Sequence, residues 1–87
     1  MKVKIVFKEF SDHAREVFEW IDQFEHRTGR EVEKVDPESR EGEGYCQARG
    51  IMEYPTVVVE GDEGRMVEQW GGTPLPVIDD VMAYVTN

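Results

Sequence analysis

Cysteine and histidine are the residue types in this chain that would carry thiol or metal chemistry. The chain has one cysteine, Cys46, and two histidines, His13 and His26. A dithiol cycle needs one sulfur to attack and a second to resolve the mixed disulfide, so Cys46 alone cannot complete one. A zinc site needs three or four convergent ligands, and the two histidines fall at opposite ends of one expected helix. The sequence therefore predicts no metal site and no cofactor.

Ser11, Asp12 and His13 have the residue types of a hydrolytic triad. Adjacent residues at the start of a helix point in different directions, so the match is one of composition only. For His13 the sequence leaves two interpretations open: an exposed surface histidine, which it favours, or a hydrogen-bonding group for a bound partner.

Cys46 is the one candidate for a reactive thiol. Free cysteine is among the most buried residue types, which favours a core position. The nearby carboxylates of Glu41 and Glu43 would raise its pKa and so lower its reactivity. The sequence favours a structural Cys46 and an absence of enzymatic activity.

Apolar periodicity predicts one α/β domain over residues 1–87, in the order strand, helix, strand, short helix, strand, strand, helix. The first half should be parallel and the later hairpin antiparallel. Ser11 and Asp12 are expected to cap the first helix, whose apolar stripe includes Phe18, with Trp20 beside it. Thr73 is expected to cap the last helix, with Pro74 at its first position. The expected strands are Lys2–Phe10, Glu31–Asp36, Thr56–Val59 and Arg65–Trp70; 38–44 is expected to be a polar loop and 45–49 a short helical turn.

Charge and composition narrow the classes of partner. The formal net charge is −9, from 19 acidic and 10 basic residues, and such a field repels nucleic acid and anionic membranes. Solubility or a saline habitat would explain the acidity without a specific basic partner.

The N-terminus shows no signal peptide, no apolar run is long enough to span a bilayer, and one cysteine forms no internal disulfide. A cytoplasmic location is expected.

Several landmarks resemble the thioredoxin and glutaredoxin family, and together they span nearly the whole chain. Tyr54-Pro55-Thr56 looks like the proline that opens the family's third strand, and Trp70-Gly71-Gly72 like the end of its last strand. Val35-Asp36-Pro37 and the stretch 45–51 also fall in register. The resemblance implies a thioredoxin-like fold, a four-stranded mixed sheet flanked by helices. It also implies a cis peptide bond before Pro55, whereas a strand-opening proline alone favours trans.

The family's Cys-x-x-Cys would fall on 11–14, where Ser11 and Ala14 stand in place of the two sulfurs. The resemblance therefore implies a redox-inactive, monomeric module that binds a protein, an extended peptide or a small thiol such as glutathione. The alternative is a divergent thiol-disulfide oxidoreductase or thiol-transferase acting through Cys46. Trp70 would either border the groove or pack on the last helix. The expected binding groove consists of Ser11, Asp12, His13, Glu53, Tyr54, Pro55, Gly71, Gly72 and Thr73.

Overall fold

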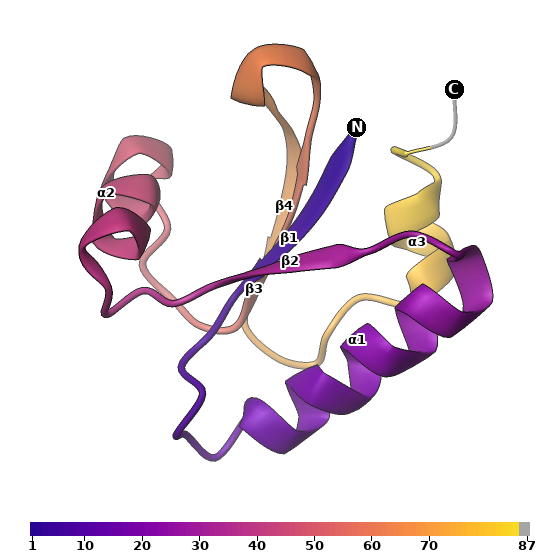
Figure 1. Cartoon of the computed structure of the whole chain (residues 1–87), viewed down its shortest axis with the longest axis horizontal. Helices are drawn as coiled ribbons and strands as arrows, with labels where there is room; N and C mark the ends of the chain where they lie inside the picture. The colour runs from indigo at the N-terminus through magenta and orange to yellow at the C-terminus, as the bar shows by residue number, and fades with distance from the viewer. Residues whose placement is uncertain (86–87) are drawn as a thin grey trace.

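The protein folds as one mixed β-sheet with helices on both faces (Figure 1). The structure is a computed structural model and describes residues 1–85. The four strands lie in the order β2-β1-β3-β4. The strands are β1 (Lys2–Val6), β2 (Val32–Val35), β3 (Thr56–Glu60) and β4 (Met66–Gly71); the helices are α1 (Ala14–Thr28), α2 (Arg40–Arg49) and α3 (Ile78–Met82), with a 3-10 turn η1 (Asp62–Gly64) between β3 and β4.

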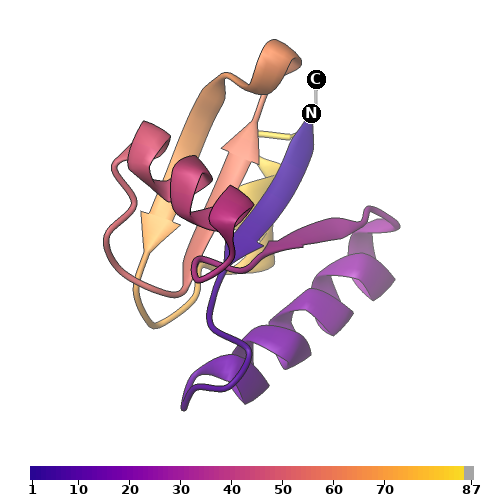
Figure 2. The same cartoon turned by 60° about the vertical axis from the view of Figure 1, so that its left-hand side comes forward.

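Strand pairing brings three loops to one end of the sheet. β1 is parallel to β2 and antiparallel to β3, and β3 is antiparallel to β4, which confirms the predicted α/β architecture. Val6 pairs with Thr56, and Thr56 pairs with Gly71. The loop after β1, the segment before β3 and the segment after β4 therefore meet at this end (Figure 2).

Helix α1 and the shorter α3 cover one face of the sheet through apolar contacts. Gly29 ends α1 in the left-handed conformation, at φ 71°, as its place after the helix predicts. Trp20 is buried, stacked on Phe24 with ring centroids 5.1 Å apart, and its Nε1 donates to the Pro76 carbonyl at 2.8 Å. The prediction that Phe18 belongs to the buried stripe was wrong, because Phe18 is 43% exposed; Trp20, expected beside the stripe, is buried at 8% exposure.

Helix α2 covers the other face, and it is longer than the sequence indicated. The prediction of a polar loop over 38–44 was wrong, because Ser39 caps a helix that begins at Arg40. The Ser39 hydroxyl accepts a hydrogen bond from the Gly42 N–H at 2.9 Å and donates one to the Asp36 carbonyl at 2.8 Å. These local bonds outweigh the low helix propensity of the two glycines in this helix.

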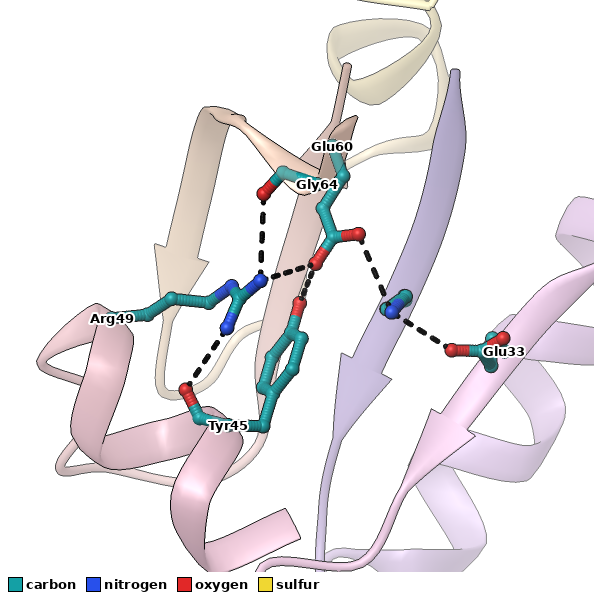
Figure 3. A network of polar contacts seen from close by, with 6 residues as sticks. Glu33, Tyr45, Arg49, Glu60 and Gly64 are labelled. Atoms are coloured by element: carbon teal, nitrogen blue, oxygen red, sulfur yellow. Dashed lines mark hydrogen bonds and ion pairs between the residues drawn. The ribbon is translucent and has the colours of Figure 1, made fainter. Parts of the chain in front are cut away.

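Polar contacts hold α2 on the sheet at the end away from Pro55 (Figure 3). The Glu60 side chain is only 4% exposed and pairs with Lys4 at 3.3 Å and with Arg49 at 3.4 Å. The Tyr45 hydroxyl donates a hydrogen bond to Glu60, and the Arg49 guanidinium lies over the Tyr45 ring at 3.7 Å. Burial and then the bond to Glu60 raise the pKa of Tyr45 above its usual 10.0, which keeps the hydroxyl a donor.

Helix α3 begins later than expected, at Ile78 with Val77 as its N-cap. The prediction that Thr73 caps this helix with Pro74 at its first position was therefore wrong. Pro76 disfavours helical geometry at Leu75, the residue before it, which opposes a helix running on from Pro74. The Thr73–Pro74 peptide bond is cis.

Candidate functional site

The loop between β1 and α1 occupies the place where the resemblance puts a cysteine pair. Its residues bond to one another: the Ser11 hydroxyl donates to the Lys8 carbonyl at 2.6 Å, and His13 Nε2 accepts from the Lys8 N–H at 3.3 Å. The expectation that Ser11 or Asp12 caps α1 was wrong, because His13 is the N-cap and no side chain caps the helix. Ser11 and His13 thus stabilise the loop itself.

His13 is half-buried rather than fully exposed, and its ring lies edge-on to Phe7 with centroids 6.5 Å apart. Asp12 is exposed beside it.

The segment 53–55 lies against the end of β4. The Tyr54–Pro55 peptide bond is cis, the geometry that the resemblance implies. The Gly72 N–H donates to the Pro55 carbonyl at 2.7 Å. The Thr56 hydroxyl donates to the Glu53 carbonyl at 2.6 Å, which fixes the turn into β3. Within residues 1–85, no hydrogen bond uses the backbone N–H or C=O of Tyr54.

The residues expected to form the groove fall into two groups. Glu53 and Pro55 lie in contact with Gly71 and Gly72, and Tyr54 stands between them in the chain. Ser11, Asp12 and His13 lie at the same end of the sheet, and their loop is joined to Tyr54 by the Lys8 ammonium, 5.6 Å from the centre of the Tyr54 ring. Thr73 is exposed and follows Gly72 directly.

Cys46 lies on α2 at a separate place. Its side chain is buried, at 5% exposure, beside a hollow of about 530 Å³ that is also lined by Tyr54 and Met52. Burial raises the pKa of the Cys46 thiol, although a hydrogen bond from the Tyr54 hydroxyl and the charge of Arg49 lower it in part. Burial is the cause of the raised pKa, whereas the sequence pointed to the carboxylates of Glu41 and Glu43. A buried thiol with a raised pKa is a poor nucleophile.

Native Cys46 is expected to react with iodoacetamide at pH 8 roughly tenfold or more slowly than Cys46 in the chain unfolded by urea. The raised pKa leaves less thiolate at that pH, and burial hinders the reagent. Mass spectrometry of timed samples gives both rates. Equal rates would show that the thiol is accessible.

A disulfide-reduction assay complements this measurement, with Cys46→Ser expected to match the unmodified chain at the background rate. Activity that disappears in Cys46→Ser would instead favour the thiol-transferase alternative.

Other candidate features have structural roles in the described part of the chain. Trp70 is half-buried and packs edge-on against Tyr84, with centroids 5.5 Å apart, next to α3.

No group of three or more His, Cys, Asp or Glu side chains among residues 1–85 is arranged to hold a metal ion. Over the same residues, no helix combines the length and apolar character needed to cross a membrane.

Sequence comparison finds no match: neither a family model nor a curated protein matches the chain. Solved structures do match it. Thioredoxin 1 from Thermosipho africanus superposes with a TM-score of 0.71 at 16% identity, covering 98% of this chain and 94% of that one. A thioredoxin variant from Halobacterium salinarum gives 0.77 at 20% identity, covering 94% and 72%. Fasciola hepatica thioredoxin gives 0.69 at 18% identity, covering 98% and 79%.

These similarities extend over almost all of the described chain and include the four-stranded mixed sheet with helices on both faces. The sequence holds one cysteine, and it lies on α2 rather than in the loop before α1. The chain therefore has the thioredoxin fold without a Cys-x-x-Cys pair.

Proposed function

We propose that this domain binds an extended peptide segment of another protein beside Pro55 and performs no dithiol chemistry. The observation that carries the proposal is the Tyr54 backbone, whose N–H and C=O form no hydrogen bond within residues 1–85. Tyr54 directly precedes Pro55 and β3, at the end of the sheet where the loops meet. An extended peptide would supply strand-like partners for both groups.

Exposed apolar side chains near this position support the proposal. Met52, two residues before Tyr54, is 89% exposed, and Phe10, in the loop between β1 and α1, is fully exposed. Large apolar side chains at such exposure are favoured at surfaces that contact a partner. Met52, which lines the same hollow as Tyr54, thus offers apolar contact beside the unpaired backbone groups.

The residues at the two positions of the family's cysteine pair argue against a redox role. Ser11 has no sulfur to attack a disulfide, and Ala14 has none to resolve one. The single thiol is buried on α2.

We also propose a cytoplasmic location, because a chain without an internal disulfide suits a reducing compartment.

Titration of ¹⁵N-labelled protein with an end-blocked peptide of alternating threonine and valine is expected to shift the amide signals of residues 53–55, 71–73 and 11–13. Strand-like pairing changes the hydrogen bonding of the Tyr54 amide directly, so its signal should move most. Reduced glutathione, tested in a parallel titration, examines the small-thiol alternative. Amides of Arg49 and Glu60, at the other end of the sheet, serve as internal controls. Shifts confined to those residues would reject the groove.

A further inference from the structure

The carboxylate of Glu53 lies directly on the backbone at the end of β4. An ideal Cβ added to Gly71 would be 2.5 Å from Glu53 Oε1, and one added to Gly72 would be 3.1 Å from Oε2. The two glycines thus provide the space that the carboxylate occupies. Glu53 and Gly71 also line a hollow of about 410 Å³, together with Met52 and Thr56. A negative charge is therefore held at the edge of the proposed peptide site.

Within residues 1–85, no lysine, arginine or histidine pairs with Glu53. The lysine of the adjoining loop, Lys8, lies over the Tyr54 ring. The same loop adds two exposed carboxylates, Glu9 and Asp12. This end of the molecule is therefore acidic, in a chain whose formal net charge is −9.

We infer that the bound segment carries a lysine or arginine side chain that pairs with the Glu53 carboxylate. The inference rests on the proposed function and adds the chemical class of the partner. An extended segment hydrogen-bonded to Tyr54 passes next to Glu53, one residue away in the chain. A cationic side chain there would meet an unpaired carboxylate, whereas an acidic one would be repelled. The excess negative charge of the whole domain would also speed the encounter with a basic partner.

The test compares two end-blocked peptides, Thr-Val-Lys-Val-Thr and the same peptide with norleucine in place of lysine, by titration calorimetry or NMR at 50 mM salt. The lysine peptide is expected to bind about threefold more tightly, a difference typical of one exposed ion pair. Glu53→Gln should abolish this preference, so that the lysine and norleucine peptides bind the variant with equal affinity. At 1 M salt the preference should disappear, because the Debye length falls to about 3 Å.

Glu31→Gln is the matched control. It removes the same charge from an exposed residue at the opposite end of the sheet, beside the start of β2, and should keep the preference for lysine. Equal binding of the two peptides by the unmodified protein would overturn the inference and leave the peptide site standing. A preference that survives Glu53→Gln, or falls equally in both variants, would overturn it as well. Failure of both peptides to bind would reject the peptide site together with the inference.

Discussion

Glu60→Ala is expected to lower the free energy of unfolding by about 3 kcal/mol or more, one of the two largest effects that we predict for this chain. Its carboxylate is the shared partner of the Lys4 ammonium, the Arg49 guanidinium and the Tyr45 hydroxyl. Removing it leaves two cations and a donor without that partner on a largely buried face. Because Tyr45 and Arg49 belong to α2, the loss also weakens the attachment of α2 to the sheet. Urea unfolding followed by circular dichroism measures the change.

Glu33→Ala is the matched control for this prediction. Glu33 pairs with the same Lys4 ammonium, at 3.0 Å, but its side chain is 53% exposed where that of Glu60 is 4%. Water screens the exposed pair, so its removal should change stability by less than about 1 kcal/mol. Equal losses in the two variants would mean that burial of Glu60 does not set the strength of these contacts.

Gly42→Ala is the second large effect, again a loss of about 3 kcal/mol, whereas Gly44→Ala is expected to stabilise the protein by about 0.5–1 kcal/mol. A Cβ on Gly42 would lie 1.7 Å from the Asp36 carbonyl oxygen and 2.9 Å from the Ser39 hydroxyl. The clash is with backbone, so the first turn of α2 must move and the Ser39 cap is lost with it. A Cβ on Gly44 meets nothing within 4 Å.

The two glycines lie in one helix, so the pair of variants separates helix propensity from packing. Propensity alone would make both alanines stabilising. Urea denaturation midpoints of the two variants, measured under identical conditions, should move in opposite directions. A Gly42→Ala protein as stable as the unmodified chain would contradict the close approach of Asp36.

Much of the architecture follows from the sequence because its signals are local. Alternating or continuous apolar runs predict the four strands, and Gly29 and Gly50 stop α1 and α2 as expected, each in the left-handed conformation. Pro37 and Pro55 mark where segments break. The order of these signals along the chain is enough to predict that β1 and β2 are parallel and that β3 and β4 are antiparallel.

Two other features were not predictable in this way. The start of α2 depends on Ser39 bonding to Asp36 and Gly42, in a stretch so charged that its composition indicates a loop. The Glu60 contacts depend on the register that sets Lys2 opposite Glu60 and so brings Lys4 near it. The one signal in the sequence for this cluster is Glu60 itself, a glutamate that directly follows the apolar run 57–59.

The candidate site shows the same division. Through the resemblance the sequence groups Glu53, Tyr54 and Pro55 with Gly71 and Gly72. The structure brings Glu53 and Pro55 into contact with the two glycines. The direction of the Glu53 carboxylate, and the bonds that tie Ser11 and His13 to Lys8, needed three-dimensional placement. Gly71 and Gly72, which leave room for the Glu53 carboxylate, lie far along the chain, and residue types alone do not specify how the loop turns Ser11 and His13 toward Lys8.

The contact between Glu53 and Gly71 has a consequence for inheritance. Any side chain at position 71 would occupy the space of the carboxylate and turn the flexible glutamate away, while leaving the fold intact. The position of the carboxylate at 53 therefore depends on the absence of a side chain at 71, although the two residues lie on different segments of the chain. Among descendants of this sequence, selection for that charge would act on both positions, and the two should change together.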